Sequence, residues 1–114
     1  MIDAEYHRNY YARTAERRRE QKRTNVAVIR DRNRKCIRDF LEEHSCVDCG
    51  EADLVVLEFH HVNPDEKVDD VANLSRDAAS LDRLIAEMLK CVVLCANCHR
   101  RRTAAEQGWH TFTG

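Results

Sequence analysis

Apolar residues recur at helical spacing over residues 26–41. They lie close to the i, i+3, i+4 and i+7 pattern of one helix face: Val26, Ile29, Cys36, Ile37, Phe40 and Leu41. Residues 5–24 instead combine three tyrosines with many arginines and have no continuous apolar stripe. No glycine or proline precedes Gly50, so this stretch contains no strong helix breaker. We expect a long helix whose first part is solvated and becomes ordered on a partner.

The pattern changes after a turn expected at residues 44–50. Residues 54–60 are rich in β-branched and other apolar side chains, and they predict a strand that ends at a double histidine. A turn signal with proline at residues 63–65 stops that strand. Residues 65–73 are then expected to form an acidic loop.

Two further helical stretches and a second strand are predicted in the last third of the chain. A helical apolar stripe covers residues 74–89 and is broken near Ser80, which is suited to cap a second piece. Residues 91–94 predict a short strand, and residues 97–107 predict a last helix that Gly108 ends. These elements predict an α+β fold that is mostly helical.

Composition limits the classes of protein to consider. A chain of 114 residues predicts one domain with an appendage. No stretch approaches the roughly 18 continuous apolar residues of a membrane span, and the N-terminus has no apolar run typical of a secretory signal. Without such a signal, six cysteines indicate metal ligands or free thiols rather than disulfides. We expect a cytoplasmic protein.

The net charge of −1 hides a strong asymmetry along the chain. Residues 6–38 contain twelve Lys and Arg and three acids, a formal charge of +9. The chain from residue 39 onward contains seven Lys and Arg and fifteen acids, a formal charge of −8. We therefore divide the chain into a basic helical arm over residues 1–43 and a domain over residues 44–114. The arm is expected to bind a polyanion.

Two Cys-x-x-Cys pairs carry the most specific chemical signal. Their four thiols match the tetrahedral coordination of zinc: Cys46, Cys49, Cys95 and Cys98. Such a zinc ion would hold the start of the domain to its end. Four unrelated buried cysteines or a redox pair are the alternatives, and neither explains two matching spacings. Cys36 and Cys91 lie on apolar faces and are expected to pack in the core.

Three histidines lie among the cysteine pairs. Neighbouring side chains in a strand point in opposite directions, so one of His60 and His61 can bind a metal while the other faces a substrate. His99 follows Cys98 directly, so zinc coordination would fix its position at the start of the last helix.

The segments LEFHHVNPDEK (57–67) and KCVVLCANCHR (90–100) resemble the small HNH endonucleases that are common in bacteriophages and bacteria. The resemblance covers roughly residues 43–103. It implies a ββα-metal core, also called a His-Me finger, in which two strands and a helix surround one divalent ion and a four-cysteine zinc braces them. The strands and last helix predicted above follow that order, with a helical insert between the strands.

The resemblance also implies roles for individual residues. His61 corresponds to the general base that activates water for phosphodiester hydrolysis. His60 and His99 correspond to ligands of the catalytic divalent metal, which is Mg²⁺, Mn²⁺ or another divalent ion. The ion would stabilise the transition state and the leaving oxygen, and neutral imidazole suits both tasks near pH 7.

The chain departs from the family at two positions. Lys90 stands where relatives carry the asparagine of the HNH motif, and Asn63, Asn73 or Asn97 remain as residues that could orient His61. Thr103 stands where many relatives carry a further histidine, which leaves two protein ligands with water and phosphate to complete the site. That ligand set suits Mg²⁺.

Basic side chains predict the substrate contacts. Phosphates flanking the cleaved bond are expected to meet Arg100, Arg101, Arg102 and Lys67. Salt-sensitive binding to duplex or branched DNA is expected from Arg17, Arg18, Arg19, Lys22 and Arg23 of the arm. The leading hypothesis is a metal-dependent DNA endonuclease in the cytoplasm of a bacterial host. The alternatives are a non-catalytic zinc module that binds nucleic acid, and an accessory subunit whose arm docks on a phage DNA-packaging machine.

Overall fold

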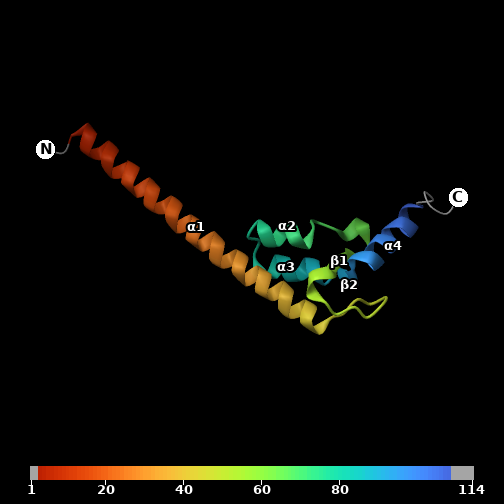
Figure 1. Cartoon of the computed structure of the whole chain (residues 1–114). Helices are drawn as coiled ribbons and strands as arrows, with labels where there is room; N and C mark the ends of the chain where they lie inside the picture. Colours follow the sequence, from red (N-terminus) through yellow and green to blue (C-terminus); the bar gives the residue numbers. More distant parts are fainter. Residues whose placement is uncertain (1–2, 109–114) are drawn as a thin grey trace.

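The computed structural model describes residues 3–108 and has a mostly helical α+β fold with one two-stranded antiparallel sheet (Figure 1). Its elements are α1 (Ala4–Glu43), η1 (Leu54–Val56), β1 (Leu57–His61), η2 (Pro64–Glu66), α2 (Val71–Arg76), α3 (Leu81–Met88), β2 (Cys91–Cys95) and α4 (Ala96–Gln107). The predicted mostly helical α+β class is therefore confirmed, and so are the predicted order of the strands and the presence of helices between them.

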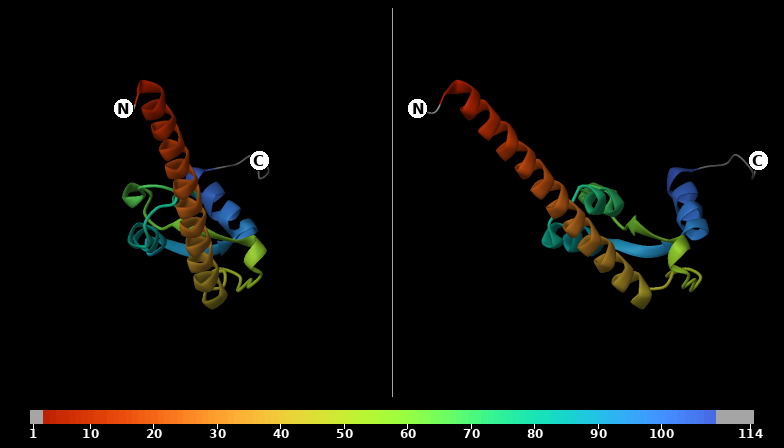
Figure 2. Two further views of the ribbon diagram at one scale, coloured as in Figure 1. Left: turned by 90° about the vertical axis from the view of Figure 1, so that its left-hand side faces the viewer. Right: turned by 60° about the vertical axis from the view of Figure 1, so that its left-hand side comes forward.

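A single uninterrupted helix forms the N-terminal arm. The carboxylate of Asp3 caps α1 by accepting a hydrogen bond of 2.8 Å from the backbone N–H of Tyr6. Forty residues at about 1.5 Å each give a helix of about 60 Å, and the chain measures 81 × 31 × 23 Å. The first half of α1 projects away from the other elements (Figure 2). Among the described residues, no helix combines the length and apolarity that crossing a membrane requires.

The sheet places the histidine pair opposite the start of β2. His61 pairs with Cys91 and His60 pairs with Val92. The prediction of a strand from residue 54 is wrong at its start, because the side chain of Asp53 accepts a hydrogen bond of 3.1 Å from the N–H of Val55 and closes a 3₁₀ turn. The strand begins three residues later and includes both histidines.

The insert between the strands contains two short helices. Helix α2 begins at Val71, so the acidic loop is shorter than predicted. The predicted break near Ser80 is confirmed, because the hydroxyl of Ser80 accepts a hydrogen bond of 3.3 Å from the N–H of Arg83 and caps α3. The last helix ends as predicted at Gly108, whose φ of 66° lies in the left-handed region.

The core consists of two clusters of buried side chains. The first contains Leu41, Cys46, Leu57, Val93, Leu94, Cys95 and Cys98, and the second contains Val71, Leu74, Ala79, Leu84 and Met88. Ile37 and Phe40 of α1 contact both clusters. Cys36 and Cys91 pack against the second cluster, as predicted. The last part of α1 therefore belongs to the core, although its first part is almost entirely exposed.

A buried amide joins α1 to the turn between α2 and α3. The side chain of Asn33 is 0% exposed and donates to the backbone carbonyls of Ala79 at 3.0 Å and Ser75 at 3.5 Å. The side-chain carbonyl oxygen of Asn33 accepts a hydrogen bond of 3.0 Å from the guanidinium of Arg32. The hydrogen-bonding atoms of Asn33 are thus paired without water, and they fix where the insert lies on the long helix.

Replacing Asn33 by alanine leaves the carbonyls of Ser75 and Ala79 without this donor. We expect the free energy of unfolding to fall by about 1–3 kcal/mol, measured by denaturant titration with circular dichroism. Asn25→Ala, at an exposed position of the same helix, serves as the control and should change stability by no more than about 0.5 kcal/mol. Equal losses in both variants would contradict a special role for the buried amide.

Candidate functional site

Four cysteines from two distant segments form one cluster. Cys46 and Cys49 lie in the loop after α1, Cys95 ends β2, and Cys98 lies in the first turn of α4. Their sulfur atoms all lie within 4.8 Å of one another. The Sγ atoms of Cys49 and Cys95 are 3.7 Å apart, close to the edge of about 3.8 Å in a tetrahedron with metal–sulfur bonds of about 2.3 Å. The cluster can hold a metal ion such as zinc.

Backbone hydrogen bonds hold the first cysteine turn and act on the thiol of Cys46. The N–H of Gly50 donates to the carbonyl of Cys46 at 2.8 Å and closes the first cysteine turn. The backbone N–H of Val47 donates to the carbonyl of Val93 at 3.0 Å and holds that turn on β2. Burial raises the pKa of the Cys46 thiol, but backbone hydrogen bonds at Cys95 and neighbouring residues outweigh it and lower the pKa to about 6. A thiolate, the form that binds metal, is therefore favoured at this position near neutral pH.

His60 and His61 contact different helices, as expected for neighbours in a strand. The Nε2 atom of His60 lies 3.1 Å from Oε1 of Glu106 in α4. The Nε2 atom of His61 lies 2.8 Å from Oε1 of Glu87 in α3. The rings of His60 and His99 lie edge to face with their centroids 5.0 Å apart. His60 and His99 are therefore in contact with each other, while a separate carboxylate holds His61.

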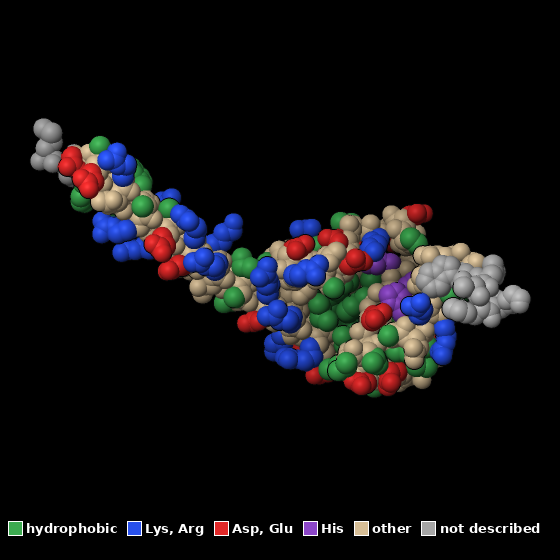
Figure 3. Space-filling view, turned by 45° about the horizontal axis from the view of Figure 1, so that its top comes forward, with side chains coloured by type: hydrophobic (Ala, Val, Ile, Leu, Met, Phe, Trp, Pro, Cys, Tyr) green, Lys and Arg blue, Asp and Glu red, His purple; other side chains and the backbone are tan. Residues whose placement is uncertain are grey.

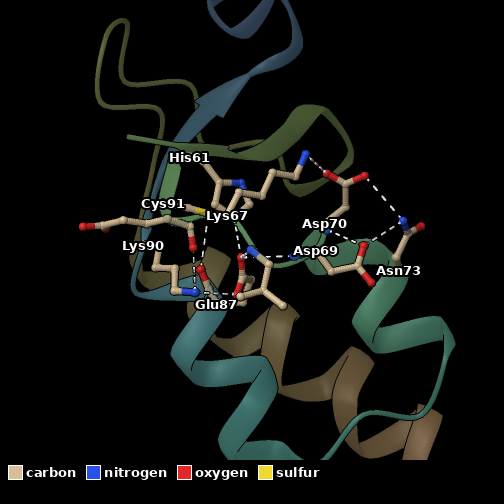
Figure 4. A network of polar contacts seen from close by, with 10 residues as sticks. His61, Lys67, Asp69, Asp70, Asn73, Glu87, Lys90 and Cys91 are labelled. Carbon is tan, nitrogen blue, oxygen red and sulfur yellow. Dashed lines mark hydrogen bonds and ion pairs between the residues drawn. The ribbon is translucent and has the colours of Figure 1, made fainter. Parts of the chain in front are cut away.

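The carboxylate of Glu87 is the centre of a buried hydrogen-bond network (Figure 4). It is 3% exposed, and its Oε1 also accepts from the backbone N–H of Val68 at 2.9 Å and Asp69 at 3.4 Å. Lys90 donates to its Oε2 at 2.9 Å. Burial raises the pKa of Glu87, but hydrogen bonds from Lys90, Val68 and His61 overcome that effect and lower it to about 2. Glu87 is therefore an anion at neutral pH.

This anion determines which ring nitrogen of His61 carries hydrogen. An ionised carboxylate only accepts hydrogen bonds, so the Nε2 atom of His61 must donate to Glu87. The Nδ1 atom of His61 is then the nitrogen that is available to accept a proton. Sequence reasoning missed Glu87, although its place between Leu84 and Met88 on the apolar face of α3 is a detectable signal, because a buried charge needs a partner.

Two of the three asparagines considered for orienting His61 have other partners, and the third, Asn97, is exposed on α4. Asn63 accepts from the N–H of Asp65 at 3.0 Å and caps η2. Asn73 donates to the carboxylate of Asp69 at 3.2 Å. Lys90 donates to Glu87 and also to the carbonyl of Glu66 at 3.0 Å.

A carboxylate also fixes the ring of His99. The Nδ1 atom of His99 lies 2.5 Å from Oε2 of Glu58 in β1, which leaves Nε2 for another partner. Histidines that bind metals commonly donate their second N–H to a carboxylate in this way. Glu58 is a second residue that sequence reasoning missed, because its partner lies 41 positions further along the chain.

The three histidines line one open hollow of about 320 Å³ together with Lys67, Thr103 and Glu106. Figure 3 shows histidine side chains gathered at one end of a hollowed apolar face. The hollow contains imidazole, hydroxyl and carboxylate groups, and it is open to solvent. It is therefore accessible to polar ligands.

The basic residues predicted to bind phosphate lie in different surroundings. Lys67 pairs with Asp70 at 2.5 Å. Arg102 donates two hydrogen bonds to Asp48, of 2.8 and 2.5 Å, and Arg101 lies 3.8 Å from the Sγ atom of Cys98. Arg100 is exposed on α4. The basic residues of the arm are exposed on the projecting half of α1: Arg17, Arg18, Arg19, Lys22 and Arg23.

Comparison of the chain with protein-family models, with curated proteins and with solved structures gives no match. The chemistry open to this protein therefore follows from its own residues and their geometry.

Removing one cysteine of the cluster tests the metal site. We expect Cys98→Ala to lose bound zinc and to unfold at a lower temperature, because the buried cluster then has three ligands. Metal content by mass spectrometry and melting by circular dichroism measure both effects. Cys36→Ala, which changes a thiol outside the cluster, should keep stoichiometric zinc. Stoichiometric zinc in Cys98→Ala would contradict the assignment.

Proposed function

We propose that this protein is a metal-dependent endonuclease of the HNH type that hydrolyses phosphodiester bonds in DNA. The observation that carries the proposal is the arrangement in one hollow of three histidines: His61, which Glu87 holds at Nε2, and the contacting pair His60 and His99. The succession of β1, β2 and α4 supports a ββα-metal core of the kind that the resemblance implies.

His61 is the general base in this proposal. Its Nδ1 atom accepts a proton from the water that attacks phosphorus, while Glu87 holds the Nε2–H and thereby the orientation of the ring. The positive charge that develops on the imidazole lies beside the Glu87 anion and is stabilised by it. Glu87 thus acts as a positioning residue that does not itself touch the substrate.

His60 and His99 are the proposed metal ligands. Imidazole nitrogen is a common metal ligand, the two rings are in edge-to-face contact, and Glu58 holds Nδ1 of His99 so that Nε2 is the nitrogen left for binding. The ion would supply electrostatic stabilisation of the phosphate and of the leaving oxygen. The zinc proposed for the cysteine cluster has a structural task, since it sets where α4 begins and therefore where His99 lies.

The arm supplies the proposed affinity for DNA. Its exposed Lys and Arg side chains favour contacts with phosphates that do not depend on base sequence. Arg102 and Lys67 already have carboxylate partners in Asp48 and Asp70. Contact between either residue and a phosphate would exchange one anionic partner for another.

Removing the proposed base tests the activity directly. We expect wild-type protein to nick supercoiled plasmid DNA in the presence of Mg²⁺ or Mn²⁺. Addition of chelator should stop the cleavage. His61→Ala should keep its zinc and its fold but lose about 10²–10⁴-fold in rate. Nicked and linear products separated on agarose gels measure the rate.

Two results would contradict this proposal. Cleavage by folded His61→Ala at the wild-type rate would remove His61 from the mechanism. Intact plasmid after incubation of wild-type protein with each metal, together with salt-sensitive DNA binding, would favour the non-catalytic zinc module instead.

Loss of the Glu87 charge should separate turnover from binding. We expect Glu87→Gln to lower turnover at saturating DNA by at least about tenfold. The upper limit is the roughly 10⁴-fold that loss of an orienting carboxylate costs in a catalytic triad. The affinity for DNA should be unchanged. Imidazole ¹⁵N shifts should report the Nε2–H tautomer of His61 in the wild type and a mixture in the variant. Asp82→Asn, an exposed change on the same helix, is the control. Wild-type turnover by folded Glu87→Gln would contradict the positioning role.

A further inference from the structure

We propose that one face of the arm binds duplex DNA in the open angle between the projecting half of α1 and the rest of the domain. This inference rests on the proposed function and adds which side chains meet the DNA and where the duplex lies. The face consists of positions that recur every three or four residues along α1: Arg8, Tyr11, Ala15, Arg18, Lys22, Val26, Ile29, Asn33, Cys36 and Phe40.

The second half of this face packs on the domain. Asn33 is buried and bonds to the turn between α2 and α3, and Cys36 and Phe40 pack against the second core cluster. The Nε atom of Arg30 donates to the carbonyl of Arg76 at 2.6 Å, so the end of α2 lies where the arm leaves the domain. Because α1 is one uninterrupted helix, its projecting half turns the same side toward the angle that it forms with α2 (Figure 1).

The projecting half of this face is basic and contains no acid. Its exposed polar members are three cations and one tyrosine: Arg8, Tyr11, Arg18 and Lys22. The opposite side of the same turns carries two cations and two acids, whose charges cancel: Arg13, Arg17, Glu16 and Glu20. Oppositely charged residues three positions apart are neighbours on a helix surface and offset each other. The side of the arm that looks toward the domain is therefore the side that attracts an anion.

The chemistry and the length of the face fit the backbone of duplex DNA. Arginine and lysine neutralise phosphates, and tyrosine hydroxyls donate hydrogen bonds to phosphate oxygens. The face covers 33 − 8 = 25 residues from Arg8 to Asn33, which is about 38 Å at a rise of about 1.5 Å per residue. One turn of duplex DNA is about 34–36 Å long. A row of cations of this length matches a repeating polyanion better than it matches a single phosphate group.

Two double variants on opposite sides of the helix test the face. Arg18→Gln with Lys22→Gln removes two charges from the face, and Arg13→Gln with Arg17→Gln removes two from the opposite side at the same spacing. Fluorescence anisotropy with a labelled duplex measures the affinity of zinc-loaded full-length protein, without added Mg²⁺ or Mn²⁺, so that no DNA is cut. We expect the first pair to weaken binding by at least about tenfold and to reduce the slope of log affinity against log salt concentration by about 2. The second pair should weaken binding by less than about threefold.

Two tyrosines allow a second measurement that locates the DNA. Tyr11 lies on the proposed face, whereas Tyr6 lies on the side of Arg13 and Arg17, and the two tyrosines are 67% and 50% exposed. A photoreactive phenylalanine analogue placed at either position should crosslink to the duplex from position 11 and not from position 6. Zinc content and circular dichroism confirm the fold of each variant, and we expect both to be unchanged because every altered side chain is exposed.

The outcomes distinguish this inference from the proposed function. Equal loss of affinity in the two double variants, or equal crosslinking from positions 6 and 11, overturns the face assignment, while plasmid nicking by the wild type would still support the endonuclease. A wild type without affinity for the duplex, or an affinity that neither pair changes, also overturns it and would leave the face to an acidic protein. Loss confined to the first pair supports the inference even where no plasmid is cut, since the readout is binding of DNA.

Discussion

The position of the last helix depends on the four-cysteine cluster. The sheet has two strands, and two strands alone are marginally stable in water, so β1 and β2 need support from outside the sheet. The cluster joins the loop after α1 to the point where β2 becomes α4. A metal bound by all four thiolates would fix the direction in which α4 leaves the sheet. His99, next to Cys98, and Glu106, two turns later, take their places from that direction.

The buried anion of Glu87 is a second constraint, at the other end of the strands. Removing a carboxylate from water is costly, and here donors from the backbone, His61 and Lys90 offset that cost. Two of these donors belong to the segment that leads into α2, so one side chain holds the insert against the end of β1. The ammonium of Lys90 partly neutralises the charge that holds the ring of His61.

Local signals in the sequence predicted much of this fold. The long helix, the break at Ser80 and the stop at Gly108 follow from residues within one or two turns, and the cysteine cluster follows from two matching Cys-x-x-Cys spacings. The contacts that sequence reasoning missed join distant positions. Asn33 bonds to residues more than 40 positions away, and the partners of His61 and His99 lie 26 and 41 positions away. Such contacts depend on how the insert and α4 pack, which no local pattern encodes.

The glutamates that contact the histidines differ in burial, and burial decides whether each carboxylate can change its hydrogen-bond partner. The pairs are His61 with Glu87, His99 with Glu58, and His60 with Glu106. The side chain of Glu87 is 4% exposed, whereas those of Glu58 and Glu106 are 49% and 53% exposed. A buried carboxylate with its lone pairs occupied can orient a ring but cannot exchange its partners for an ion or water. An exposed carboxylate can, because solvent replaces its present contact at little cost. Glu106 contacts Nε2 of His60 and Glu58 contacts Nδ1 of His99, so both of these histidines have a partner that solvent can replace, whereas His61 does not.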